Sequence, residues 1–118
     1  MKIQWITLNV KDMVQSKAFY GDFLGLPCVR SFSPGHGMQI AFFQADNGMQ
    51  IELMEAPELP YRHIQGVSIG IETTNYDELL EKAKQAGILH GEPQILGGKL
   101  ECFFILDPDG AGIQLIKS

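Results

Sequence analysis

The chain has no stretch that could cross a membrane as a helix, because none of its apolar runs approaches the roughly 18 residues that a span requires. It has no run of Lys or Arg either, and its net charge of −5 disfavours nucleic acid and anionic membrane surfaces as partners. Residues 1–5 lack the longer apolar run and the small-residue cleavage site of a signal peptide. We therefore expect a cytoplasmic protein whose partner is a small organic molecule.

Cysteine is scarce, since Cys28 and Cys102 are the only two. They form neither a close-spaced metal motif nor a disulfide framework, so we expect both to be small apolar residues of strands in a reducing compartment. With 45% apolar residues in 118, the chain can bury one substantial core. The expected organisation is a single domain that spans residues 1–118.

What the sequence does contain is an internal repeat. An offset of 61 residues matches residues 6–10 with 67–71, and an offset of 62 matches 48–53 with 110–115. A repeated unit that cannot bury its apolar face alone implies two sheets that share one concave space. The repeat therefore predicts a groove lined by equivalent positions from two modules.

Each half of the chain shows the pattern of one strand, one helix and three strands. In the first half, alternation predicts a strand at 3–10, and Asp12 and Gln15 predict the capped start of a helix that ends at Gly25. Turn-forming residues then separate three more predicted strands, at 27–32, 38–45 and 49–55. The first module is therefore βαβββ and covers residues 1–56.

The second half repeats this plan after a linker at 57–65, in which two prolines disfavour a helix or a central strand. Asn75 with Glu78 predicts the helix start, and Gly87 predicts its end. The predicted strands lie at 67–72, 93–97, 100–106 and 112–117. Residues 66–118 thus form a second βαβββ module, and the predicted fold class is α+β.

Several segments carry a resemblance to a known family: 10–12 leading to Ser16, then 19–20 and 24–26, and finally 107–110 before 113–116. Together they resemble the vicinal oxygen chelate superfamily, which includes glyoxalase I, extradiol dioxygenases, methylmalonyl-CoA epimerase, and fosfomycin- and bleomycin-resistance proteins. The resemblance covers essentially the whole chain. It implies a curved mixed sheet around a groove, but it does not specify one function, because this scaffold supports many.

The resemblance also implies where a metal would bind, with one ligand from the first and one from the last strand of each module. Those positions are Trp5 and, at an offset of 61, Gly66, with Glu52 and Gln114 on the closing strands. One carboxylate and one amide without an imidazole make a poor site for zinc, nickel or iron. We expect no metal cofactor unless a shift in register brings in His63; His36 and His90 are more typical of solvated surface residues.

The altered positions suggest a binding site for an organic ligand. Trp5 could stack on a flat ligand beside the small residues Gly66, Ser68 and Gly70, or it could simply fill the space that the metal vacated. Glu52 could meet Gln114, Asn9, the Trp5 N–H or a cationic ligand, could act as a general base, or could remain hydrated. The candidate ligand-binding residues are Trp5, Thr7, Asn9, Gln50, Glu52, Ser68 and Gln114.

Three functional hypotheses follow. In the first, the protein is a metal-free homodimer of the bleomycin-resistance type that sequesters a drug or metabolite. In the second, it is an enzyme that resembles lactoylglutathione lyase or an isomerase and uses Glu52 as its base or a divalent metal. In the third, the groove is closed and the chain is an interaction module. The small number of possible metal ligands favours the first.

Overall fold

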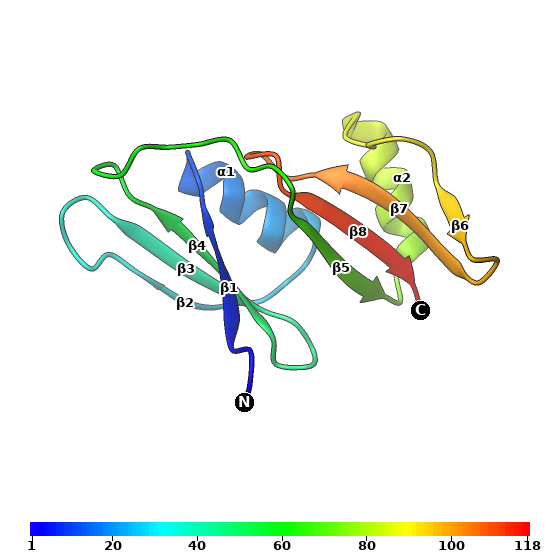
Figure 1. Cartoon of the computed structure of the whole chain (residues 1–118), viewed down its shortest axis with the longest axis horizontal. Helices are drawn as coiled ribbons and strands as arrows, with labels where there is room; N and C mark the ends of the chain where they lie inside the picture. The colour runs from blue at the N-terminus through cyan, green and yellow to red at the C-terminus, as the bar shows by residue number, and fades with distance from the viewer. The chain divides into compact units, whose positions relative to one another are not determined.

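The computed structural model describes residues 1–118, which divide into two compact units, Met1–Arg62 (unit 1) and His63–Ser118 (unit 2). The division falls within the predicted linker at 57–65. Each unit contains one four-stranded mixed sheet and one helical segment, which confirms the α+β fold of two βαβββ modules (Figure 1). No helix is both long enough and apolar enough to span a membrane.

In unit 1 the first strand lies parallel to the last. Its elements are β1 (Trp5–Asn9), α1 (Met13–Lys17), η1 (Ala18–Phe23), β2 (Cys28–Phe32), β3 (Gln39–Gln44) and β4 (Gln50–Glu55). The strand order in the sheet is β1-β4-β3-β2, with β1 parallel to β4 and the other pairs antiparallel. Because only β2, β3 and β4 are joined by hairpins, the helical segment supplies the crossover that brings β1 beside β4.

Unit 2 repeats this topology strand for strand. Its elements are β5 (Ser68–Thr73), α2 (Tyr76–Ala86), β6 (Gln94–Leu96), β7 (Leu100–Leu106) and β8 (Gly112–Lys117). The order is β5-β8-β7-β6, and β5 is parallel to β8. Eight strands were predicted and eight are found, each within two residues of its predicted ends.

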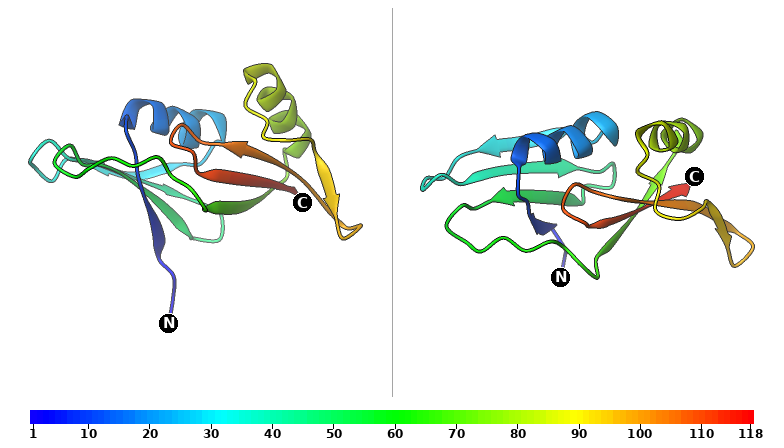
Figure 2. Two further views of the ribbon diagram at one scale, coloured as in Figure 1. Left: turned by 45° about the horizontal axis from the view of Figure 1, so that its top comes forward. Right: turned by 90° about the horizontal axis from the view of Figure 1, so that it is seen from above.

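Each sheet has one face covered by its own helix, which we call the helix-covered face, and an opposite helix-free face (Figure 2). In unit 1, Leu8, Phe43 and Leu53 are buried on the helix-covered face, and the Tyr20 ring packs 6.3 Å from that of Phe43. In unit 2, Phe103 is buried against Tyr76 of α2, with ring centroids 5.1 Å apart. Because successive side chains of a strand point to opposite faces, every second residue lies on the helix-free face and is available for binding.

The first helix confirms its predicted cap but changes form after five residues. The Asp12 carboxylate accepts hydrogen bonds from the backbone N–H groups of Val14 and Gln15, at 3.0 and 3.4 Å. From Ala18 the helix widens into the π-helix η1, where Gly21 lies against the ring of Phe43. The spacing of apolar residues did not distinguish this wider turn from a continuous α-helix.

The second helix begins and ends at the predicted residues, but its N-terminus lacks the expected side-chain hydrogen bond. Gly87 adopts the left-handed conformation, with φ of 68°, and terminates α2. The Asn75 side chain does not cap the helix; instead it lies within hydrogen-bonding distance of the Thr73 hydroxyl. Asn75 therefore occupies the predicted N-cap position, but its side chain makes no capping hydrogen bond, because a neighbouring threonine competes for it.

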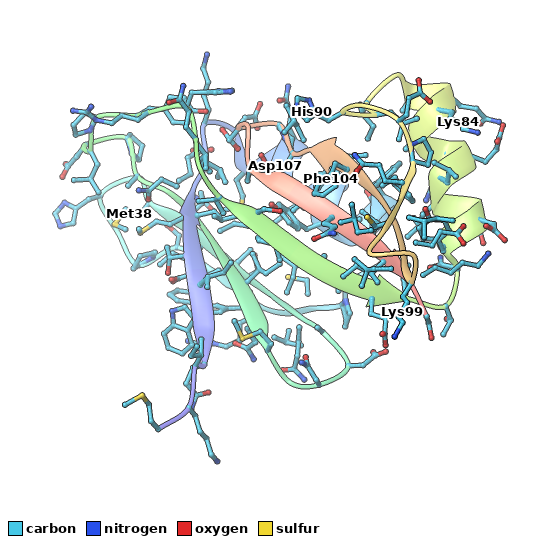
Figure 3. The ribbon with its side chains drawn as sticks, turned by 45° about the vertical axis from the view of Figure 1, so that its right-hand side comes forward. Met38, Lys84, His90, Lys99, Phe104 and Asp107 are labelled. Atoms are coloured by element: carbon cyan, nitrogen blue, oxygen red, sulfur yellow. The ribbon has the colours of Figure 1, made fainter.

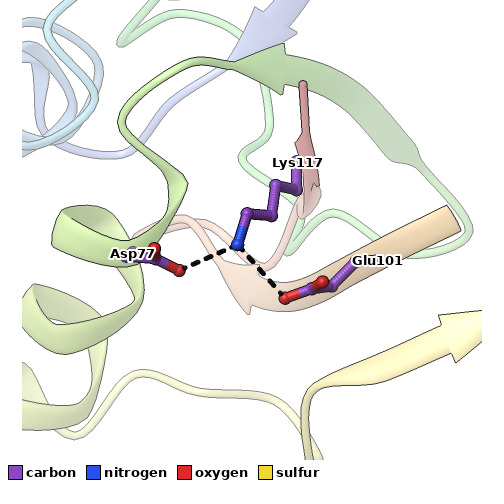
Figure 4. A network of polar contacts seen from close by, with 3 residues as sticks. All are labelled: Asp77, Glu101 and Lys117. Atoms are coloured by element: carbon purple, nitrogen blue, oxygen red, sulfur yellow. Dashed lines mark hydrogen bonds and ion pairs between the residues drawn. The ribbon is translucent and has the colours of Figure 1, made fainter.

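Polar contacts at the surface of unit 2 link α2 to the last two strands. Figure 4 shows the Lys117 ammonium linked to both Asp77 and Glu101. Its nitrogen lies 3.5 Å from the Asp77 carboxylate and 3.8 Å from that of Glu101. It also lies 5.7 Å from the centre of the Tyr76 ring. Burial raises the pKa of the Tyr76 phenol, and the nearby carboxylates of Glu101 and Asp77 raise it further.

The registers of the two sheets correct the predicted pairing of the repeats. The hairpins before β4 and β8 match at an offset of 62, since Ala45 N–H donates to Met49 O as Asp107 N–H donates to Ala111 O. Trp5 pairs with Gln50, and Ser68 pairs with Gly112, so the first strands match at an offset of 63. The structural counterpart of Trp5 is therefore Ser68 rather than Gly66, on the same face of the sheet.

The tight turn before β8 is stabilised by hydrogen bonds as well as by its proline and glycine. Asp107 is buried, and its Oδ1 accepts hydrogen bonds from the N–H groups of Asp109 and Ala111, at 2.8 and 2.9 Å. The chain before β5 packs directly on this turn, because Ile64 N–H donates to Asp109 O at 2.8 Å. A β-carbon at Gly110 would lie only 2.7 Å from Ile64 O and would also collide with the His63 ring.

This packing predicts different costs for one substitution at two equivalent glycines. Gly48 and Gly110 have similar positive φ angles, 89° and 98°, but a β-carbon at Gly48 would have no neighbour within 4 Å. Gly48→Ala should cost about 1–2 kcal/mol from backbone strain alone. Gly110→Ala should cost a further 1–3 kcal/mol or so from overpacking, as measured by urea denaturation. Equal losses for the two variants would contradict the close packing around Gly110.

Candidate functional site

The helix-free face of unit 1 carries five of the seven predicted ligand-binding residues. Trp5, Thr7 and Asn9 alternate along β1 with inward-facing apolar residues, and Gln50 and Glu52 do so along β4. The register places Trp5 beside Gln50 and Thr7 beside Glu52. The five side chains therefore form one continuous polar and aromatic surface on two neighbouring strands.

Trp5 is partly packed and partly exposed. Its ring meets that of Phe42 in a T-shaped arrangement, with centroids 5.3 Å apart and an interplanar angle of 81°. Even so, 45% of the residue is exposed, whereas Phe42 is 3% exposed. The indole thus covers Phe42 and still presents surface to a ligand, combining the two roles that the sequence left open.

Glu52 has a partner that the sequence analysis did not name. The Thr7 hydroxyl donates a hydrogen bond to Glu52 Oε1 at 2.5 Å, across the parallel strand pair. Within unit 1 no other hydrogen bond or ion pair holds this carboxylate, so Oε2 is left for a ligand. The neighbouring Gln50 is already engaged, because its amide donates to Gln44 Oε1 at 2.8 Å.

Two further residues of this face, Arg30 and Phe42, were missed. The Arg30 guanidinium lies 5.1 Å from the centre of the Phe42 ring and 5.0 Å from that of Phe32. Across the four strands, Arg30 pairs with Phe42, Phe42 with Glu52, and Glu52 with Thr7. We call these four residues the unit 1 row. It could not be assembled from the sequence without the register of β2.

The equivalent residues of unit 2 form a second row. His90 N–H donates to Phe104 O at 2.8 Å, Phe104 pairs with Gln114, and Gln114 pairs with Gly70. The unit 2 row is therefore His90, Phe104, Gln114 and Gly70. The Gln114 amide N–H lies 3.4 Å from Cys102 Sγ and donates to it. Ser68, the seventh predicted residue, lies on the same face beside Gly112.

A hollow of about 320 Å³ lies beside this second row. Its lining includes Gly66, Ser68, His90, Phe104, Leu106 and Gly112. Figure 3 shows Phe104 on β7, His90 on the loop that follows α2, and Asp107 in the turn before β8. We call this hollow the unit 2 pocket. His90, expected to be a solvated surface residue, is exposed and also contributes to the pocket wall.

Unit 1 has a larger hollow, of about 580 Å³, along the side of its helix. Two of its lining side chains are already engaged within the protein: Lys17 donates to Ser31 Oγ at 2.6 Å, and the Cys28 thiol donates to Arg30 O at 3.4 Å. None of the predicted ligand-binding residues lines it. The helix-free face, with the free oxygen of Glu52, is the better candidate site.

The residues at the implied metal positions do not fit a transition metal. The corrected register gives Trp5 and Ser68 on the first strands and Glu52 and Gln114 on the last. An indole cannot coordinate, a hydroxyl and an amide are weak ligands, and no imidazole completes the set. In neither unit do three or more His, Cys, Asp or Glu side chains form a group that could hold a metal ion. His63 lies before β5, beside Gly110, rather than on the strand.

Comparison with known families gives one match over nearly the whole chain. The sequence model of the Glyoxalase/Bleomycin resistance protein/Dioxygenase superfamily matches residues 2–115. No curated protein matches the chain significantly.

Solved structures share the fold at low sequence identity. A trypanothione-dependent glyoxalase I from Leishmania major is 21% identical with a TM-score of 0.80, over 99% of this chain and 86% of that one. A superfamily member from Sphaerobacter thermophilus is 20% identical with a TM-score of 0.78, over 100% and 98%. A lactoylglutathione lyase from Agrobacterium tumefaciens is 18% identical with a TM-score of 0.73, over 99% and 93%. At these identities the similarity shows the fold alone.

The donor set predicts that the purified protein carries no stoichiometric transition metal. Elemental analysis of protein prepared without a His tag should find zinc, nickel and iron well below one atom per chain. Chelator treatment should leave the melting temperature unchanged, because no metal contributes to folding. Stoichiometric metal that a chelator removes, with a fall in melting temperature, would contradict this assignment.

Proposed function

Since the chain belongs to the glyoxalase/bleomycin resistance protein/dioxygenase superfamily, we propose that it is a metal-free binding protein that sequesters a small drug or metabolite. The observation that carries this proposal is the pairing of a half-exposed Trp5 ring with a fixed carboxylate on one face of unit 1. A ring platform and a charged anchor are the elements of a specific small-molecule site. We also propose Ser68 and Gln114 of unit 2 as ligand contacts.

The chemistry of the face favours a ligand with an aromatic ring and a positive charge. Trp5 offers a large apolar surface for stacking, and Phe42 supports it from beneath. Glu52 is held in one orientation by Thr7, which reduces the entropy lost when a cation binds to its free oxygen. Arg30 lies over the rings of Phe32 and Phe42 and forms no ion pair with Glu52. Arg30 therefore does not occupy the position beside the carboxylate that a cationic ligand would take.

A second candidate function is an enzyme of the lactoylglutathione lyase or isomerase type. The same hydrogen bond favours it, because a carboxylate fixed through one oxygen can accept a substrate proton on the other. Without a metal to acidify the substrate, the base alone supplies less catalysis. An assay for lactoylglutathione lyase activity separates the candidates: turnover that Glu52→Gln abolishes would support the enzyme.

We further propose that the protein works in the cytoplasm as a homodimer. Both cysteines are free thiols, which suits a reducing compartment. Every residue of the edge strands β2 and β6 is exposed, and β6 presents Ile95 and Leu96. Exposed strand edges with apolar side chains favour pairing with a second copy.

Two substitutions test the binding site, with 2-phenylethylamine and neutral 2-phenylethanol as probes. Trp5→Ala should weaken both by about 1–3 kcal/mol through lost stacking and burial. Glu52→Gln keeps the acceptor for Thr7 and should weaken only the amine, by about 1 kcal/mol or more. Isothermal titration calorimetry measures both effects, and Trp5, as the only tryptophan, reports binding by fluorescence in the parent protein.

Matched controls keep this test specific. Leu59→Ala removes an exposed apolar side chain and Glu58→Gln removes an exposed carboxylate, both in the loop that follows β4 in unit 1. Both should leave the two affinities unchanged. If Trp5→Ala binds both probes as tightly as the parent, the helix-free face of unit 1 is not the site.

The oligomeric state gives a separate prediction. Sedimentation velocity at tens of micromolar should show a dimer, because an interface of standard size holds at that concentration. A single species with the mass of one chain, 13.1 kDa, would rule the dimer out. The binding proposal for unit 1 would survive that result.

A further inference from the structure

The two units place different side chains over equivalent phenylalanines. In unit 1, Trp5 and Gln50 form a pair of neighbours on β1 and β4, and the Trp5 ring covers Phe42. In unit 2, the equivalent neighbours are Ser68 and Gly112. Phe104, the equivalent of Phe42, consequently remains only partly buried and lines the unit 2 pocket.

The floor of this pocket is kept clear by the backbone. A β-carbon at Gly112 would lie 3.0 Å from Val67 O, which is tighter than ordinary side-chain contacts. A larger residue there would have to displace the Val67 carbonyl by a few tenths of an ångström, and Gly112 itself places no side chain beside Phe104. The volume of about 320 Å³ lies at the lower end of the range of roughly 300–1,000 Å³ for ligand pockets. It suits a ligand of one or two fused rings.

The edge of the pocket supplies one group that can carry a positive charge. The backbone of His90 pairs with Phe104 as that of Arg30 pairs with Phe42, and His90 is the only ionisable residue in the lining. The nearby Asp107 carboxylate faces its own turn, where Oδ1 accepts two backbone N–H groups. No carboxylate therefore lines the pocket to repel an anionic ligand.

We propose that the unit 2 pocket binds a small planar aromatic carboxylate, whose ring packs on Phe104 in the way that the Trp5 indole packs on Phe42, with its carboxylate directed to His90. Unit 1 provides the template, because there the protein itself supplies the aromatic ring. The site rests on the proposed function in one respect, since Ser68 is proposed there as a ligand contact, but it requires neither Trp5 nor Glu52. It also differs in ligand charge, because Glu52 favours a cation and His90 an anion.

The test uses indole-3-carboxylate as the probe and two-dimensional NMR of the isotope-labelled full chain as the readout. Binding should shift the amide resonances of residues 66–68, 90 and 104–106 and leave those of 5–9 and 50–54 in place. Two comparison compounds separate the contributions of ring and charge. Cyclohexanecarboxylate should bind roughly tenfold more weakly, and indole roughly two- to fivefold more weakly.

Ser68→Trp is the decisive variant, because it places an indole where unit 1 has Trp5. It should abolish binding of the probe, whereas Thr74→Trp, at an exposed turn outside the pocket, should leave binding unchanged. If Ser68→Trp fails to fold, as judged by its thermal melt, Phe104→Leu provides the alternative. It keeps an apolar side chain without a ring and should weaken the probe about three- to tenfold.

His90→Ala gives an independent check on the charge. It should weaken indole-3-carboxylate roughly two- to fivefold and leave indole unaffected. Resonance shifts confined to residues 5–9 and 50–54 would overturn the unit 2 site while supporting the unit 1 site. Unchanged binding to a folded Ser68→Trp variant, or equal affinity for the cyclohexane analogue, would also overturn it.

Discussion

The parallel pairing of the first and last strands in each unit is the constraint on which the rest of the structure depends. It requires a crossover, so the helix must cross one face of the sheet and leave the other without cover. It also fixes which residues are neighbours across the pair, Thr7 with Glu52 in unit 1 and Gly70 with Gln114 in unit 2. The strand order therefore determines where the candidate site lies, and the individual residues then determine its chemistry.

The order of elements and the faces of the strands could be predicted from the sequence, but the register could not. Alternation has a period of two, so moving β5 by two residues against β8 leaves every side chain on its original face. Sequence similarity alone matched Trp5 with Gly66, whereas backbone hydrogen bonds from Gln50 to Gln4 and from Gly112 to Val67 match it with Ser68. The predicted faces of the strands were correct in spite of this error, but the predicted pairing of positions between the two modules was wrong.

Side-chain partners were the least predictable part of the site. Glu52 was expected to meet an amide, an indole N–H or a ligand, and its actual partner is Thr7, which lies 45 residues earlier in the chain. Arg30 was not considered, because its position over Phe42 depends on a bulge that shifts the register between Cys28 and Arg30. Phe42 and Phe104 could have been found, since they match at the same offset of 62 that relates Glu52 to Gln114.

The comparison of the two rows shows how one plan can support two kinds of surface. Both have a phenylalanine at the centre, with a basic side chain on one side and a carboxylate or amide on the other. Beside the phenylalanine, unit 1 has the large residues Trp5 and Gln50, and unit 2 has Ser68 and Gly112. In unit 1 the Trp5 ring packs on the phenylalanine and forms an aromatic surface. In unit 2 the small residues leave a hollow beside the equivalent phenylalanine. Because the strand order and the parallel pair of first and last strands are the same in both units, the two surfaces differ mainly in the volume and charge of the side chains around the phenylalanine.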